Sequence, residues 1–236
     1  MATQLQIRSC PKCDEDRKVL GRGVMIKVDG VDQEVCEVCG LPSVKSHVEK
    51  QASKTRDHLL RWSELDLSKA QGQLEDAESY IKDAEEKLPD DWQEVAGNCR
   101  MARMKADAAL RTARTDTVTI LLKQTQANLD KAGQVKSAKK KKKEREDDQK
   151  RLDILREKIE KGLSVSRQSL EDSQNMTLRW QDRESLLTGA VRQAAQAFFR
   201  SKSYLDDKDE ANVERLVEQK LGKDDSEGEP QDEERQ

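Results

Sequence analysis

The sequence predicts a mostly α-helical protein that begins with a small zinc-stapled β-ribbon. Three observations carry this prediction: two Cys-x-x-Cys pairs near the start, long runs of heptad-spaced apolar residues, and 39% charged against 3% aromatic residues. So few aromatic side chains do not fill a large globular core, whereas paired helices each need only one apolar stripe. We expect a zinc ribbon (1–43), a three-helix antiparallel coiled coil (44–205), a short C-terminal helix (206–222) and a disordered acidic tail (223–236).

The two cysteine pairs are the most specific chemical signal in the chain. They are Cys10 with Cys13, and Cys36 with Cys39. Four thiolates at this spacing are typical of a closed, tetrahedral structural zinc site, whereas catalytic zinc keeps an open position. We therefore predict that one structural Zn²⁺ ion is held by these four residues, in preference to a set of ordinary buried thiols.

Between the two cysteine pairs, apolar residues occupy every second position at Val24, Ile26 and Val28, as in a β-strand. Glycine-containing turns bound this run at 21–23 and 29–30, which predicts a β-hairpin. The ribbon has no Phe, Tyr or Trp and buries too little surface to fold alone. We therefore expect zinc binding and folding of the ribbon to be one event.

A resemblance appears at Gly30-Val31 followed by Cys36-Glu37-Val38-Cys39-Gly40. These residues resemble the zinc domain of the YgiT/MqsA-type antitoxins, over about residues 7–42 of this chain. In that family the four cysteines hold a structural zinc, the zinc domain binds a partner toxin, and a separate helix-turn-helix domain binds DNA. For this chain the resemblance implies a structural zinc and a ribbon that contacts another protein.

Charge and residue type narrow the role of the ribbon. Residues 1–46 carry 7 basic and 7 acidic side chains and no aromatics, which favours protein contact over nucleic-acid binding. His47 is a candidate general base, but a histidine at the start of a helical segment is usually an exposed or capping residue. We prefer the second interpretation.

Heptad spacing predicts the first long helix over 44–88 and the second over 92–132. Pro89 ends the first helix, and the aspartates that follow it suit the start of the second. Alternating large residues and alanines is typical of closely packed antiparallel helices. The first seam has Leu60, Leu67, Leu74, Ile81 and Leu88, with Ala70, Ala77 and Ala84. The second has Trp92, Cys99, Ala106, Ala113, Ile120 and Ala127, with Val95, Ala102 and Ala109.

Cys99 lies on this second stripe. We interpret it as a small core residue rather than a reactive thiol.

The third predicted helix, over 140–205, has a more polar seam. Its apolar positions are Leu152, Ile159, Trp180, Leu187 and Ala194 on one stripe, and Leu163, Leu170, Val191 and Phe198 on the other. Polar residues interrupt the stripe at Ser166, Ser173, Thr177 and Glu184.

The end of this third helix is apolar around much of its circumference. It offers a candidate interface for self-association or a partner, formed by Val191, Phe198, Phe199 and Tyr204. The alternative is that a short helix over 211–221 folds back and covers these residues. The sequence leaves both open.

A lysine run offers a second candidate site, for nucleic acid. It consists of Lys139, Lys140, Lys141, Lys142 and Lys143. Acidic residues follow at once, so a solvated helix start is the preferred alternative. Residues 206–236 carry 13 acidic and 5 basic side chains, which predicts a disordered tail at the end of the chain.

These patterns favour a cytoplasmic, non-enzymatic adaptor or assembly protein that oligomerises or binds a protein partner. The chain has no long apolar run or secretory pattern, so neither membrane insertion nor export is expected. No cofactor motif or catalytic constellation is evident, and no small-molecule substrate is expected. The alternatives are a nucleic-acid-associated regulator that uses the lysine run with the ribbon, and an accessory of a chromosome-maintenance-type ATPase.

Overall fold

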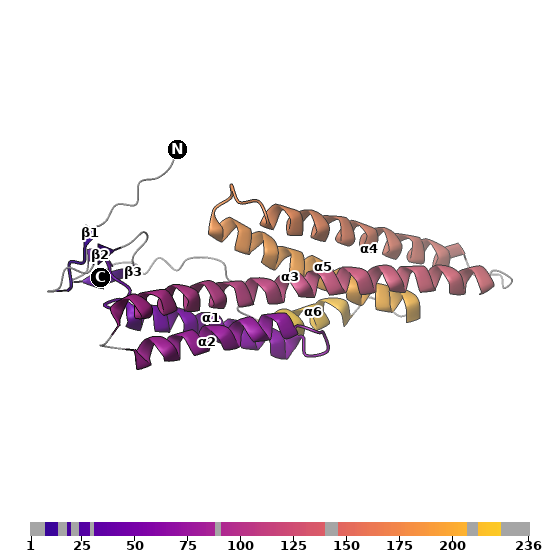
Figure 1. Cartoon of the computed structure of the whole chain (residues 1–236). Helices are drawn as coiled ribbons and strands as arrows, with labels where there is room; N and C mark the ends of the chain where they lie inside the picture. The colour runs from indigo at the N-terminus through magenta and orange to yellow at the C-terminus, as the bar shows by residue number, and fades with distance from the viewer. Residues whose placement is uncertain are drawn as a thin grey trace. The chain divides into compact units, whose positions relative to one another are not determined.

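The computed structural model confirms a mostly helical chain with a small β-ribbon at its start (Figure 1). It describes residues 8–13, 18–19, 24–28, 31–87, 91–139, 146–206 and 212–222. Two small antiparallel sheets pair β1 (Arg8–Ser9) with β2 (Lys18–Val19), and β3 (Val24–Val28) with β4 (Val31–Val35). The helices are α1 (Leu41–Arg61), α2 (Ser68–Glu86), α3 (Trp92–Lys139), α4 (Glu146–Ser173), α5 (Trp180–Asp206) and α6 (Val213–Leu221).

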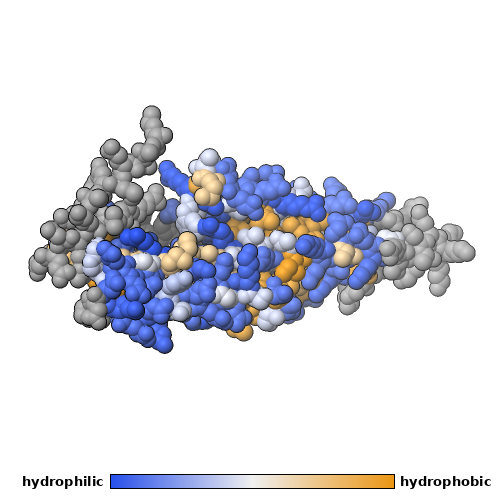
Figure 2. All heavy atoms as spheres, viewed as in Figure 1, coloured by the Kyte–Doolittle hydropathy of each residue, from blue (hydrophilic) through white to orange (hydrophobic). Residues whose placement is uncertain are grey.

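The surface agrees with the charged composition. Figure 2 shows a mostly hydrophilic face on which apolar side chains gather near the middle of the view. Within the described residues, every helix is too short or too polar to cross a membrane.

The hairpin of β3 and β4 shows the predicted alternation. Val24 pairs with Val35, and both side chains are buried. Met25 pairs with Glu34 and is 56% exposed. Because successive strand residues point to opposite faces, one face of the hairpin packs inward and the other faces solvent. The predicted turn residues, 21–23 and 29–30, lie outside the described residues.

The chain divides into two compact units, and none of the three boundaries between them falls at residue 43. Unit 1 comprises residues 1–57 and 68–112, and unit 2 comprises 58–67 and 113–236. Helices α1 and α3 therefore contribute residues to both units. The ribbon is part of unit 1, where its Val35 and Cys36 belong to the same apolar cluster as Ile81 of α2.

Small side chains fill the helical part of unit 1. The predicted alanine seam of α2 is confirmed, because Ala70, Ala77 and Ala84 are all 0% exposed. Such small residues let neighbouring helices lie close together. The buried residues of α3 in this unit include Val95, Cys99, Ala102, Ala106 and Ala109, at the predicted alternating spacing.

The start of α3 is capped as its sequence predicts. The Oδ1 atom of Asp91 accepts the backbone N–H groups of Gln93 and Glu94, each at 3.0 Å. This satisfies two of the unpaired donors at the helix start. The helix continues to Lys139, beyond the predicted end at 132.

The predicted helix over 44–88 is two helices, α1 and α2, separated by residues 62–67. Leu60, predicted on the seam, is 76% exposed, whereas Trp62 in the connection is fully buried. A turn joins them, in which the Leu65 N–H donates to the Trp62 carbonyl at 2.9 Å. The seven-residue spacing from Leu60 to Leu67 is therefore coincidental. Leu88 lies outside the described residues.

The buried stripe of α3 changes its spacing where unit 2 begins. After Ala113 the buried residues Thr117, Leu121 and Thr125 follow at intervals of four. Ala127, predicted on the seam, is exposed. A straight α-helix has 3.6 residues per turn, so a strict seven-residue pattern drifts around it and leaves the buried face.

The predicted third helix is also two helices, α4 and α5. Between them the Asn175 side chain accepts the backbone N–H of Thr177 at 3.0 Å and its hydroxyl at 2.8 Å. Such local side-chain bonds compete with the helix and favour a turn. Trp180, predicted on the seam, begins α5 and is 43% exposed.

In unit 2, helix α6 packs over the apolar end of α5, which is the second of the two alternatives left open by the sequence. Its Val217 and Leu221 are buried in the core of the unit. Lys220 Nζ donates to the carbonyl of Arg61 at 2.6 Å and pairs with Glu64 at 2.7 Å. The predicted interface residues are members of this core, with Val191, Phe198, Phe199 and Tyr204 all 9% exposed or less.

Candidate metal centre

The four predicted metal ligands lie together in unit 1. Cys10 follows β1, and Cys36 follows β4. The sulfur atoms of Cys10, Cys13, Cys36 and Cys39 all lie within 4.8 Å of one another. The Sγ atom of Cys13 is 3.4 Å from that of Cys36 and 3.0 Å from that of Cys39. Within the described part of the chain, this is the one cluster of His, Cys, Asp or Glu side chains that can hold a metal ion.

The four sulfur atoms lie close enough together to hold one metal ion. Zinc holds each thiolate at about 2.3 Å, which places two ligands of a tetrahedron about 3.8 Å apart. The separations of Cys13 from Cys39 and from Cys36, 3.0 Å and 3.4 Å, are shorter than that value, and all four sulfur atoms lie within 4.8 Å of one another. Cys10 and Cys36 are 4% and 1% exposed, so half of the donor set is shielded from water.

Backbone N–H groups point at two of the sulfur atoms. The N–H of Cys36 donates to Cys10 Sγ at 3.3 Å, and the N–H of Cys39 donates to Cys36 Sγ at 3.5 Å. Burial opposes ionisation of Cys10, but the N–H groups of Cys36 and Lys12 prevail and lower the pKa of its thiol to about 7. The bonds to Cys10 Sγ favour its thiolate, which is the form that binds metal.

The thiols of Cys13 and Cys39 resist ionisation. Burial raises the pKa of Cys13 far above its usual range, and the neighbouring thiols of Cys39 and Cys36 raise it further. Burial also raises the pKa of Cys39. Because negative sulfur atoms this close repel one another, all four ionise together only around a cation. Four sulfur ligands in tetrahedral spacing are typical of zinc or of an iron–sulfur centre.

Gly40 lets the second cysteine pair pack against the hairpin. A Cβ atom at this position would lie 2.5 Å from the Cβ of Val24 on β3, which is closer than atoms approach in proteins. The Gly40 N–H also donates to the Cys36 carbonyl at 2.9 Å, and its own carbonyl accepts the N–H of Val44 at 3.0 Å. The glycine is therefore required for close approach, at the point where the cysteine loop leads into α1.

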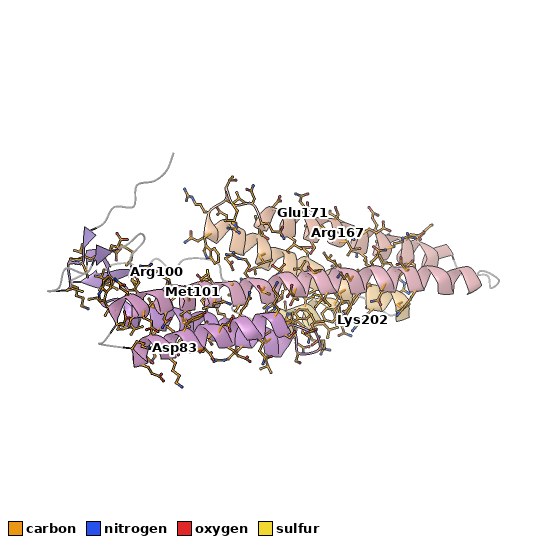
Figure 3. The ribbon with its side chains drawn as sticks, viewed as in Figure 1. Asp83, Arg100, Met101, Arg167, Glu171 and Lys202 are labelled. Carbon is orange, nitrogen blue, oxygen red and sulfur yellow. The ribbon has the colours of Figure 1, made fainter. Side chains whose placement is uncertain are left out.

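The loop between Cys36 and Cys39 is tied to α3. Arg100, which Figure 3 labels on α3, donates from Nε to Glu37 Oε1 at 2.6 Å, and the Glu37 side chain is 5% exposed. The Cys99 thiol lies 4.0 Å from the Glu37 carbonyl. No sequence signal pointed to this connection, because 63 residues separate Glu37 from Arg100.

Cys99 itself has the environment of a core residue. It is 0% exposed, and burial, together with the negative charge of Glu37, raises the pKa of its thiol to about 11. A reactive cysteine needs a lowered pKa and access to solvent. The environment therefore fits the interpretation of Cys99 as a small packing residue.

His47 is paired with an acidic side chain and is not a member of the four-cysteine group. Its Nε2 atom is 2.8 Å from Asp107 Oδ1, and it lies on α1 in unit 1. A hollow of about 410 Å³ opens beside it, lined by Val24, Met25, Glu34, Ser43, Val44, His47 and Arg103.

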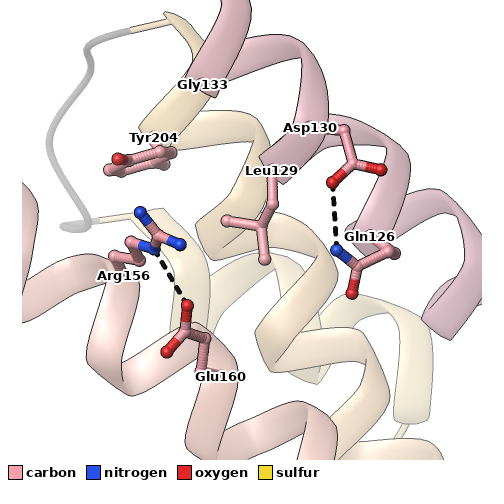
Figure 4. Close-up of a pocket in the computed structure, with 7 residues that line it drawn as sticks. All are labelled: Gln126, Leu129, Asp130, Gly133, Arg156, Glu160 and Tyr204. Atoms are coloured by element: carbon pink, nitrogen blue, oxygen red, sulfur yellow. Dashed lines mark hydrogen bonds and ion pairs between the residues drawn. The ribbon is translucent and has the colours of Figure 1, made fainter.

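A second hollow, of about 430 Å³, lies in unit 2 (Figure 4). Its polar side chains pair with one another: Arg156 donates to Glu160 at 2.9 Å, and Gln126 donates to Asp130 at 3.1 Å. These pairs hold the charged groups that a ligand would need, so we assign no ligand to this hollow.

The predicted nucleic-acid patch is not placed by the structure. Residues 140–143 lie outside the described residues, as does the side chain of Lys139, the last residue of α3. The acidic tail over 223–236 also lies outside them.

Comparisons with family models, with curated proteins and with solved structures find no match for this chain. No family model thus supports the resemblance to the YgiT/MqsA-type antitoxins. The four-cysteine group able to hold a metal ion is the part of that expectation that the structure shows.

Proposed function

We propose that this chain is a non-enzymatic zinc protein, in which a structural Zn²⁺ ion stabilises unit 1 as a binding surface for a protein partner. One observation carries the proposal: four cysteine sulfur atoms lie within 4.8 Å of one another. Four protein ligands saturate a tetrahedral zinc ion and leave no position for a reacting water or substrate. The role of the metal is therefore structural.

The hairpin beside the metal site supplies the proposed contact surface. Its solvent-facing side exposes Met25, at 56%. Val31, on the opposite face with Val35, is 61% exposed, and Met104 of α3 is 55% exposed in the same unit. Flexible, polarisable methionine side chains are common at protein-binding surfaces. The hollow lined by Met25 and Arg103 adds a concave element to this surface.

The residues at the end of α5 are buried, so the structure gives no support to self-association through them. Val191, Phe198, Phe199 and Tyr204 pack inside unit 2 beneath α6. We therefore place the proposed partner contact on unit 1.

The first test is metal content. The purified chain is expected to hold one zinc ion, measured by elemental analysis, and to release it to a chelator. A chain that holds no metal, or an iron–sulfur cluster with visible absorbance, contradicts the proposal.

The second test is partner capture. Met25→Glu combined with Met104→Glu is expected to abolish recovery of a partner that wild type retains reproducibly. Met176→Glu is the matched control, because Met176 is 79% exposed in unit 2. Equal loss from both variants, or no loss from either, contradicts the proposed surface. A shift of duplex DNA that weakens steeply with salt would favour the nucleic-acid alternative.

A further inference from the structure

We propose that the Glu37–Arg100 ion pair couples the metal site to the folding of the helices in unit 1. Metal binding would then stabilise α1, α2 and the first half of α3 as well as the ribbon, and Arg100 would act as a positioning residue for the metal. This inference rests on the zinc site proposed above.

The first evidence is the place of Glu37. It lies between two of the ligands, Cys36 and Cys39, yet its side chain is only 5% exposed. A carboxylate so buried needs a partner, and Arg100 Nε supplies one at 2.6 Å. The side chain of Arg100 is 50% exposed, so the pair has one buried and one solvated end.

A second contact joins the same loop to the same helical turn. Cys99 directly precedes Arg100 on α3, and its thiol lies 4.0 Å from the Glu37 carbonyl. Glu37 therefore contacts α3 through both its side chain and its backbone. Partners behind metal ligands fix the orientation of those ligands, and their loss usually weakens metal binding.

The core of unit 1 extends the connection to the other helices. One apolar cluster contains Cys10 and Cys36 together with Val44 of α1, Ile81 of α2 and Val95 of α3. The remaining helical positions are largely alanines, which bury less apolar area than leucines and so stabilise the fold less. The helices therefore depend more on the contacts around the cysteine loop.

Coupling of this kind acts in both directions. A metal ion that binds only the folded unit stabilises it by an amount set by metal concentration and affinity. By the same linkage, any contact that holds the loop in its folded geometry raises metal affinity. Arg100 is such a contact, because without it the Glu37 carboxylate would be buried unpaired beside the thiolates.

The test compares Arg100→Gln with Lys105→Gln in the full-length chain. Lys105 lies on the same helix and pairs with Asp76 of α2 at 2.6 Å, instead of with the carboxylate of Glu37. In competition with a chelator, Arg100→Gln is expected to bind zinc about 10- to 100-fold more weakly than wild type. Lys105→Gln is expected to bind zinc as wild type does.

A rescue separates positioning from a general loss of stability. Adding Glu37→Gln to Arg100→Gln removes the unpaired carboxylate and is expected to recover part of the zinc affinity. Failure of the double variant to exceed Arg100→Gln, or equal zinc affinity in Arg100→Gln and wild type, overturns the inference. If Arg100→Gln does not fold, hydrogen exchange of the wild-type chain is measured before and after chelation instead. Unchanged protection of residues 92–109 then overturns the inference. A wild-type chain without zinc overturns the proposed function itself, whereas unaltered affinity in Arg100→Gln overturns only the coupling.

Discussion

The two compact units bury different kinds of side chain. The helical core of unit 1 consists largely of alanine, valine and cysteine. Unit 2 buries most of the large apolar residues, including Trp62, Leu121, Ile159 and Leu187, each 2% exposed or less. Because hydrophobic stabilisation rises with the apolar area buried, unit 2 can be stabilised by its own core, whereas unit 1 needs a further source of stability. The four-cysteine site supplies that source in our account.

The largest expected effect follows from loss of the metal site, which belongs to unit 1. Cys36→Ser removes one of four ligands and is expected to abolish tight zinc binding and to unfold unit 1, because structural zinc contributes about 10–16 kcal/mol in small zinc domains. Elemental analysis and circular dichroism measure the two effects. Cys99→Ser is the matched control, a buried cysteine outside the ligand set, and is expected to keep one zinc ion. Loss of zinc from both variants would contradict the assigned ligand set.

The next effect concerns the core of unit 2. Trp62→Ala is expected to lower the free energy of unfolding by about 3–5 kcal/mol, because Trp62 is fully buried among the apolar residues of that unit. Zinc content should not change. Trp180→Ala, at a site 43% exposed, is the control and should cost much less in denaturant titrations. Equal costs would show that the Trp62 cluster does not stabilise unit 2.

A buried histidine predicts a pH dependence within unit 2. Burial, with the positive charges of Arg114 and Arg61, lowers the pKa of His58 to about 3. Its Nε2 atom lies 2.9 Å from the Thr117 hydroxyl. Between about pH 6.5 and pH 3, the His58 side chain binds a proton in the unfolded chain but not in the folded chain. The free energy of unfolding is therefore highest above this window and falls as the pH falls through it.

The comparison of wild type with His58→Gln isolates this contribution from protonation of the thiols. Glutamine does not titrate and still offers a hydrogen-bonding group to Thr117. Between pH 7 and pH 5, wild type is expected to lose about 2 kcal/mol more stability than the variant in chemical denaturation. Parallel pH profiles for the two proteins would contradict a neutral, buried His58.

The smallest effects test packing within unit 1. Gly40→Ala is expected to cost about 1–3 kcal/mol, because the added Cβ would meet Val24 at 2.5 Å. Gly72→Ala, on α2, meets nothing within 4 Å and is expected to add about 0.5–1 kcal/mol, because alanine favours a helix more than glycine does. Thermal melting of the zinc-loaded chain measures both. Opposite signs support close packing of the ribbon, and a neutral Gly40→Ala would contradict it.

The sequence predicted those features that depend on local chemistry. The spacing of the four cysteines was enough to identify the group that the structure brings together. The alanine seam of α2 and the aspartate at the start of α3 were equally clear, because helix periodicity and capping act over a few residues.

The sequence did not reveal features that depend on distant contacts. The interruption after Arg61 contains no glycine or proline, and Trp62 turns inward only because unit 2 provides a core for it. The turn at Asn175 had a local signal in its polar neighbours, which we interpreted as a polar seam. The Glu37–Arg100 pair had no signal, since nothing in a single sequence relates two charges 63 residues apart.

Hydrogen exchange before and after zinc removal tests most directly whether the two units are stabilised by different means. After chelation, amides of residues 31–57 and 68–109 should lose protection, whereas those of 146–173 and 180–206 should retain it. Uniform loss across both sets, or no loss in either, would contradict the account.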